Sequence, residues 1–226
     1  MKSLVSAFTI VSSLSLLSAG AALADEDAGS LSRATIPAVT HALEIGVGAG
    51  YTQGTGDIGS GMSSLGDLSG AGGSAELQVG YRIIPHLELG LYGSFSGFQS
   101  GDALADSTNV LGASAGVQAA WHFLPAEALD PWIGLSTGWR GLWLSPDSGK
   151  NTSLQGLELA RLQVGLDYRV TPEVAIAPVV GASLSMFVSQ DAPGQSGYQD
   201  INDPQANVFF FAGVMGRFDL LGEQVR

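Results

Sequence analysis

Cysteine is absent from the 226-residue chain, and charged residues, basic ones above all, are scarce. The lack of cysteine excludes disulfides, thiolate metal sites, cysteine nucleophiles and a lipid-modified lipoprotein cysteine. Charged residues make up 13% of the chain, whereas about 25% is usual in soluble domains. Nine Lys and Arg against 21 Asp and Glu form no clustered basic patch. We therefore expect no nucleic-acid partner, because phosphate binding requires such a patch.

Long apolar runs are also missing after residue 24, where no stretch approaches the roughly 18 apolar residues of a spanning helix. Before it, Lys2 precedes a serine-interrupted apolar stretch, Leu4 to Leu17, and the small-x-small pattern Ala22-Leu23-Ala24. This order predicts a signal peptide over residues 1–24, cleaved after Ala24, with a membrane anchor as the alternative. Residues 25–39 show no periodicity and are expected to form a periplasmic lead-in.

The rest of the chain, residues 40–226, alternates with period two, which is typical of strands with two unlike faces. Between Leu43 and Tyr51 the large apolar residues take odd numbers, and Glu44 and glycines take even ones. We expect eight strands in all. They cover residues 43–51, 74–83, 87–96, 111–123, 132–143, 161–170, 174–188 and 208–220.

A repeated motif supports this count, because YRIIP, WHFLP and YRVTP each end a run with a proline that cannot donate to a ladder. Short connections at these prolines alternate with long connections rich in Gly, Ser, Asp and Asn. This alternation predicts an all-β fold, an eight-stranded antiparallel up-and-down transmembrane β-barrel with short periplasmic turns and long extracellular loops. Its edges must close on each other, because unpaired backbone groups are costly in hydrocarbon.

A soluble eight-stranded barrel would carry the same alternation with its large apolar residues inside. The polar faces of the runs, however, are mostly Gly, Ser, Ala and Gln, which suit a narrow interior better than a solvated surface. Aromatic residues gather near the strand ends, as expected for girdles at the two headgroup layers. The predicted girdle consists of Tyr51, Tyr81, Trp121, Trp143, Tyr168, Phe210 and Phe218.

With its signal peptide, its LEIGVGAGY and LELGLYGSF runs, the YRVTP turn and the final strand FFFAGVMGRFDL, the chain resembles a known family. These features are similar to those of small outer-membrane β-barrels related to the transmembrane domain of outer-membrane protein A. The resemblance extends over about residues 40–221 and implies a bacterial outer-membrane location. It also implies insertion by the outer-membrane assembly machinery, which reads a final strand with an aromatic such as Phe218, and contact with outer-membrane lipid and lipopolysaccharide.

Charged residues on the polar faces are the candidate site residues of the lumen. Glu76, Arg140 and Arg161 should meet halfway along the lumen, near Gln78, Gln118 and Gln163. A second set should lie at the periplasmic mouth: Glu44, Arg82, Glu88, Asp167, Arg169, Arg217 and Asp219. Because an unpaired buried charge is costly, these groups are expected to pair and plug the lumen. A gated ion path past the central group is the alternative.

Catalytic and cofactor sites are not indicated. The three histidines, His41, His86 and His122, fall at the periplasmic end and cannot reach an outer-leaflet lipid ester, although His122 with Asp167 leaves a periplasmic site possible. No metal-ligand spacing or phosphate loop is present, so we expect no cofactor and no metal. The protein is therefore expected to have a structural, envelope-stabilising or surface-interaction role, with a narrow channel for small solutes or ions as the alternative.

Two positions and the loops lead to further expectations. Pro178 should cause a bulge or kink in the seventh strand, and by strict alternation Glu158 should face outward at the outer rim. The loops predicted to be extracellular hold eight aspartates and one lysine, which favours a solvated surface or weak Ca²⁺ bridging to lipopolysaccharide. The sequence does not identify their partners.

Overall fold

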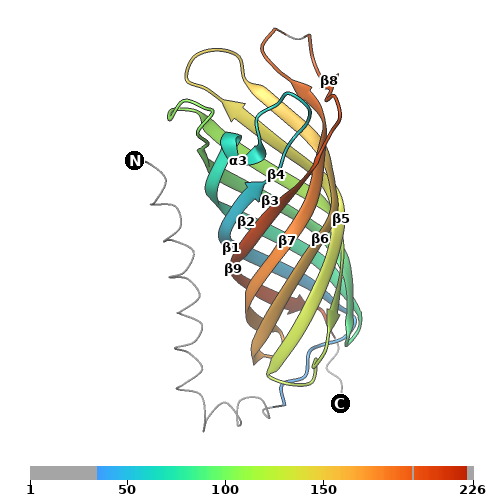
Figure 1. Ribbon diagram of the computed structural model, residues 1–226. Coiled ribbons are helices and arrows are strands. Elements are labelled where there is room, and N and C mark those ends of the chain that lie inside the picture. Colours follow the sequence, from blue (N-terminus) through green and yellow to red (C-terminus); the bar gives the residue numbers. More distant parts are fainter. Residues whose placement is uncertain (1–34, 195, 223–226) are drawn as a thin grey trace.

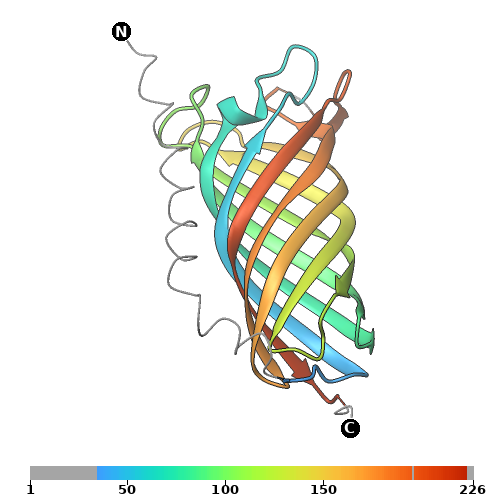
Figure 2. The ribbon, with the colours of Figure 1, turned by 60° about the horizontal axis from the view of Figure 1, so that its bottom comes forward.

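The computed structural model describes residues 35–194 and 196–222, so the predicted signal peptide lies outside the described residues. These residues form a barrel of tilted strands (Figures 1 and 2). The long strands are β1 (Ala42–Thr55), β2 (Ser69–Ile84), β3 (Leu87–Ser100), β4 (Asn109–His122), β5 (Leu129–Ser145), β6 (Thr152–Thr171), β7 (Val174–Asp191) and β9 (Ala206–Leu220). The short elements are α3 (Leu65–Leu68) and β8 (Gln199–Asp200).

The long strands close into a ring through antiparallel pairs only. From β1 to β7 each long strand pairs with the next one, β7 pairs with β9, and β9 pairs with β1. This up-and-down order confirms the predicted eight-stranded barrel. No helix among the described residues is long and apolar enough to cross a membrane.

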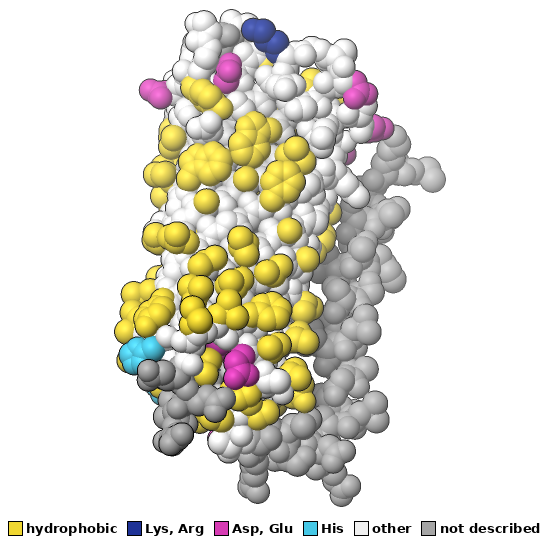
Figure 3. Space-filling view, turned by 180° about the vertical axis from the view of Figure 1, so that it is seen from behind, with side chains coloured by type: hydrophobic (Ala, Val, Ile, Leu, Met, Phe, Trp, Pro, Cys, Tyr) yellow, Lys and Arg dark blue, Asp and Glu magenta, His cyan; other side chains and the backbone are white. Residues whose placement is uncertain are grey.

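The two faces of the wall have opposite character. Large apolar side chains such as Leu91, Leu135 and Val214 point outward, with exposed fractions of 61%, 59% and 57%. Figure 3 shows hydrophobic side chains over most of the wall below a cap that carries charged groups. The charged and amide side chains of the strands are mostly buried inside. Such a barrel is apolar where a soluble one is polar, so the wall faces lipid and the soluble alternative is excluded.

The two ends of the barrel differ in the length of their connections. Short turns at residues 85–86, 123–128 and 172–173 lie at one end, and loops at 56–68, 101–108, 146–151 and 192–205 lie at the other. We call these the turn end and the loop end; by the usual pattern they face the periplasm and the exterior. The segment before β1 crosses the turn end, where the Ala38 amide donates to the Pro125 carbonyl at 2.7 Å.

Pro178 does not shift the register, so the predicted bulge is wrong. Burial alternates without interruption through this part of β7, and Pro178 faces outward opposite Val214 of β9. Only the ladder to β6 has a gap there, between the pairs Gly165–Val179 and Tyr168–Ile176, with the same register on both sides. The proline therefore interrupts the pairing with β6 locally and leaves the inward–outward alternation of β7 unchanged.

The alternation of inward and outward side chains is interrupted instead in β5 and β6. The pairing of these strands shifts between Ser136 and Gly138, and the pairing of β6 with β7 shifts between Glu158 and Ala160. Leu157 and Leu159 both point outward, and Glu158 is fully buried inside. The prediction that Glu158 faces outward at the rim is therefore wrong, because strict alternation does not hold across the bulge.

Glycines face each other in pairs where neighbouring strands approach most closely on the inner side. The pairs are Gly50–Gly213, Gly80–Gly90 and Gly116–Gly138. A Cβ on Gly116 would lie 2.0 Å from the Thr137 carbonyl oxygen and 2.7 Å from the Cα of Gly138. A side chain at this position would force the two backbones apart.

We expect Gly116→Val to lower the free energy of unfolding by about 1–3 kcal/mol, as overpacking does elsewhere. Gly93→Val is the matched control, because a Cβ there finds its nearest neighbour, the Ser114 carbonyl oxygen, only at 4.0 Å. Urea titration of the refolded barrel, followed by the gel shift between unboiled and boiled samples, measures both. An equal loss in the two variants would contradict the close-approach argument.

Candidate functional site: the filled lumen

The predicted girdle residues lie on the outer wall. Tyr81, Trp121, Tyr168 and Phe218 are exposed near the turn end of their strands. Tyr51 and Phe210 are exposed nearer the loop end. Trp143 is half-buried, and its ring packs 5.9 Å from that of Trp139. Amphipathic rings at these heights suit the two headgroup layers.

The lumen near the turn end contains a dense set of buried charges, which we call the turn-end cluster. Its members are Glu44, Arg82, Glu88, His122, Asp130, Asp167, Arg169, Arg217 and Asp219. All seven residues predicted for the periplasmic mouth are in this cluster. The strands supply them from around the ring, because β1, β2, β3, β4, β5, β6 and β9 each contribute at least one.

Three arginines connect the acids of this cluster. Arg217 forms ion pairs with Glu44 and, at 2.6 Å, with Glu88, and its guanidinium lies 4.7 Å from the centre of the Trp132 ring. Arg82 also pairs with Glu44. The third arginine, Arg169, pairs with Asp219 at 3.2 Å and donates to the Pro172 carbonyl at the same distance. Charge-assisted bonds of this kind offset part of the cost of burying these groups.

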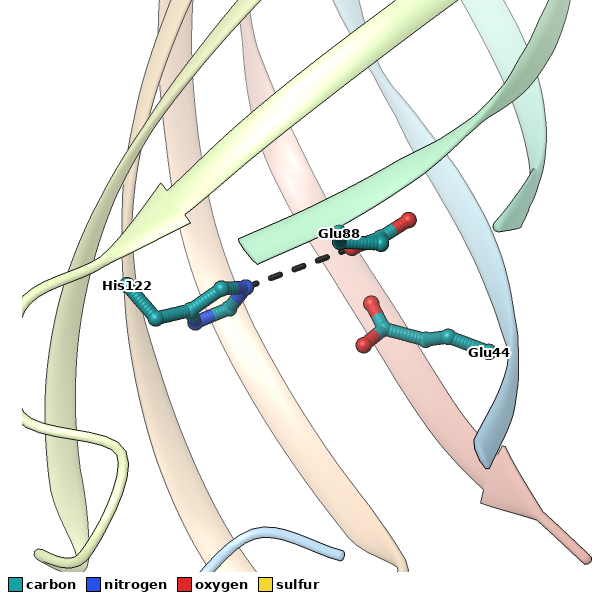
Figure 4. A group of neighbouring side chains, drawn as sticks. All are labelled: Glu44, Glu88 and His122. Atoms are coloured by element: carbon teal, nitrogen blue, oxygen red, sulfur yellow. Dashed lines mark ion pairs between the residues drawn. The ribbon is translucent and has the colours of Figure 1, made fainter. Parts of the chain in front are cut away.

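His122 lies inside this cluster, fully buried. The carboxylate beside its Nδ1 atom is that of Asp130, at 2.8 Å, whereas the nearest oxygen of Asp167 is 3.9 Å away. The pairing of His122 with Asp167 considered from the sequence is therefore replaced by one with Asp130. Figure 4 shows the other edge of the ring, which faces Glu88, with Glu44 close by.

Halfway along the lumen, four charged residues form a chain that we call the mid-lumen cluster: Glu76, Arg161, Glu158 and Arg140. Arg161 pairs with Glu76 and lies 3.9 Å from Glu158. Arg140 donates twice to Glu158, from Nε at 3.0 Å and from Nη2 at 2.5 Å. Glu158 therefore links Arg140 to the other two predicted residues, a role that its expected outward orientation would have prevented.

Two glutamines extend the mid-lumen cluster. Gln78 and Gln163 both donate to Glu76, at 2.7 and 3.0 Å. Gln118, expected in the same place, lies 3.5 Å from Glu88 and so contacts the turn-end cluster instead. A pocket of about 30 Å³ lies beside Glu76 and Gln163, with room for about two water molecules.

The loop end of the lumen is apolar, which the sequence reasoning missed. Ile58 and Leu65, from the loop that contains α3, pack down onto side chains of the strands. The complete set, which we call the apolar layer, is Ile58, Leu65, Phe98, Val110, Leu142, Leu144, Leu154, Phe187, Ile201 and Phe209. Figure 1 shows α3 at the mouth of the barrel. The lumen is thus filled by two charged layers below and an apolar layer above.

Comparison with known proteins identifies the fold. No family model and no curated protein matches the chain. Neisserial surface protein A matches in structure with a TM-score of 0.52 and 17% identity, covering 79% of this chain and 97% of its own. The outer membrane protein OprG from Pseudomonas aeruginosa gives 0.51 and 12%, covering 80% and 98%.

The chain has the fold of the small outer-membrane β-barrels. Because its outer wall is apolar, this outer-membrane barrel crosses the membrane with its strands. The shared fold agrees with the predicted bacterial outer-membrane location. The arrangement inside can hold charges in fixed pairs and keep bulk water out.

Some of the missed residues had a signal in the sequence. Asp130 and Trp132 share the even-numbered face with His122 across the turn between β4 and β5, but the strand expected there begins at residue 132, whereas β5 begins at Leu129. Leu142, Leu144 and Leu154 are large apolar residues on the otherwise polar face at the loop end, and such positions mark an inner apolar layer.

Removal of Arg217 should destabilise this outer-membrane barrel strongly. Arg217→Met leaves Glu44 and Glu88 buried without their shared cation, and the free energy of unfolding should fall by roughly 3–5 kcal/mol, as when one partner of a buried pair is removed. Lys150→Met, at an exposed loop position, is the control and should change little. Urea unfolding measures both, and a wild-type midpoint for Arg217→Met would contradict the pairing described.

Proposed function

We propose that the protein is a closed structural barrel that anchors an acidic loop surface in the outer membrane, in an envelope-stabilising or surface-interaction role. The observation that carries this proposal is the filling of the lumen in three successive layers. A solute would have to displace the apolar layer and then separate buried ion pairs. Both steps are costly, because the buried charges would lose partners that water cannot replace in so narrow a space.

Two barriers would oppose the passage of an ion, the apolar layer and the buried ion pairs, and the apolar layer is the stronger. Phe98, Phe187 and Phe209 are buried in this layer, and their rings do not replace the hydration shell of an ion. Leu65 is held there by its place in α3, whose Ser64 cap accepts from the Asp67 amide and whose Leu65 amide donates to Gly56. The loop is thus part of the fold, and opening it would expose apolar surface.

A narrow conduit for small solutes is the second candidate, and one observation favours it. A pocket of about 430 Å³ opens at the loop end, lined by Met62, Leu68, Leu104, Leu144 and Leu154, with Lys150 at its rim. The pocket would serve as a vestibule if the apolar layer moved aside. Since its floor is that same layer, the pocket fits surface binding better than transport.

The loop surface supports a surface-interaction role. Most of the loop aspartates are exposed and only Lys150 opposes them among the described loop residues. Such a surface suits divalent cations that bridge to lipopolysaccharide phosphates, and the apolar wall suits outer-membrane lipid. The outer-membrane assembly machinery is the partner proposed for insertion.

We assign no enzymatic role, since the histidines lie at the turn end, away from the outer leaflet.

Conductance in a planar bilayer tests the closed lumen. The refolded wild-type barrel should give no ion steps above the lipid background. Arg161→Ala, which removes the central cation of the mid-lumen cluster, should stay equally silent because the apolar layer remains. Val47→Ala, on the lipid-facing wall, is the control for insertion and handling.

Steps in the wild type would count against a closed lumen. If their size changed in Arg161→Ala and not in Val47→Ala, the current would pass the mid-lumen cluster, and the conduit would replace the structural role as the best-supported function.

A further inference from the structure

The two charged layers of the lumen differ in their balance. In the mid-lumen cluster, two arginines face two glutamates, so the charges cancel. In the turn-end cluster three arginines face five carboxylates, those of Glu44, Glu88, Asp130, Asp167 and Asp219. The excess is a formal charge of −2 when His122 is neutral. A buried excess of this size calls for further positive charge, because isolated buried carboxylates are very costly.

His122 has carboxylates at both edges of its ring, and an arginine lies within hydrogen-bond distance of them only at the Nε2 edge. At the Nε2 edge, Glu44 and Glu88 both pair with Arg217, whose Nη2 lies 3.4 Å from Nε2. At the Nδ1 edge, the nearest arginine atoms to the Asp167 Oδ2 atom are 3.7 and 3.9 Å away, beyond hydrogen-bond distance. The excess negative charge is therefore concentrated on the Nδ1 side.

On this side Asp167 Oδ2 is buried and has no hydrogen-bond partner. It faces His122 Nδ1 at 3.9 Å, and Asp130 Oδ2 lies 2.8 Å from the same nitrogen. One nitrogen and two carboxylate oxygens thus lie within 4.8 Å of one another. A cation between them would give the Asp167 oxygen its missing partner.

The remaining oxygens of these carboxylates are held by protein donors. The Leu124 amide donates to Asp130 Oδ1 at 2.9 Å, and the Trp132 indole donates to Asp167 Oδ1 at 2.8 Å. Both carboxylates are therefore oriented with one oxygen turned toward Nδ1. Outer donors that fix a ligand in this way are a regular feature of protein metal sites. Glu88, 4.0 Å from Nε2, stands where it could accept the proton of that nitrogen.

We propose that His122, Asp130 and Asp167 bind one divalent transition-metal cation of the zinc class. One imidazole nitrogen and two carboxylate oxygens suit Zn²⁺, which bonds such atoms at about 2.0–2.2 Å and accepts water as a fourth ligand. The cation balances the excess of −2 and takes the place of the proton between Nδ1 and Asp130, and that proton moves to Nε2, so the imidazole stays neutral. It joins β4, β5 and β6 at the turn end.

This site does not depend on whether the lumen conducts. Because the three ligands meet only in the folded barrel, binding stabilises the folded state, and the gain grows with the concentration of free metal. The site would act as a clamp at the end of the barrel where the connections are shortest and the charge excess is buried.

The test uses the full mature barrel, refolded in detergent, treated with EDTA and then passed to metal-free buffer. After incubation with zinc sulfate and gel filtration, elemental analysis should find one zinc per wild-type barrel, and the thermal unfolding midpoint should rise with added zinc. Asp167→Asn, which keeps the shape of the side chain, and His122→Gln should each weaken zinc affinity by about tenfold or more.

His86→Gln is the matched control. His86 lies at the same end of the barrel, with its ring stacked 5.5 Å from Trp121 and its Nδ1 bonded to the His122 carbonyl at 2.7 Å, and it is outside the proposed site. This variant should retain one zinc. Unboiled gels show which variants fold. If His122→Gln does not fold, the zinc content of Asp167→Asn is compared with that of the wild type and His86→Gln.

Absence of bound zinc in the wild type would overturn the proposal, whatever the variants do, and would leave protons as the counter-charge. Zinc retained equally by wild type, Asp167→Asn and His86→Gln would also overturn it, since the metal would then be bound by other residues. A conducting wild type would leave the metal site standing, so the two proposals fail separately.

Discussion

Backbone hydrogen bonding in hydrocarbon is the constraint on which the structure depends. Lipid offers no partner to an amide or carbonyl, so each strand must be paired on both sides and the sheet must close. The pairing of β9 with β1 completes that ring. Once the ring has eight strands, the lumen is narrow, the wall that faces lipid must be apolar, and the polar side chains that point inward must find their partners there.

The narrow lumen explains both the abundance of glycine and the arrangement of charge. Glycine pairs such as Gly116–Gly138 let neighbouring strands approach closely. Charges that enter the lumen cannot reach bulk water, so they pair in layers. Around His122 the carboxylates outnumber the arginines and this pairing is incomplete, and the proposed cation would complete it.

Residues near bulges and turns show where prediction from the sequence failed. Alternation placed Glu76, Arg161 and Arg217 in the lumen because their strands are regular around them. It misplaced Glu158, since a bulge between Glu158 and Ala160 changes which face the later residues occupy. It also gave Pro178 too large an effect, because the ladder to β9 runs past the proline without a register shift.

By itself, the sequence determined the barrel: a period-two pattern, alternating connection lengths and an apolar face that only lipid can accept are all local properties. The tertiary structure alone decided which charges meet. Arg140 reaches Glu158, and His122 reaches Asp130, through strand register and bulges that no local pattern encodes. The burial of Leu65 inside the barrel likewise depends on the closed ring, because the loop can pack into the open end of the barrel only when the strands surround it.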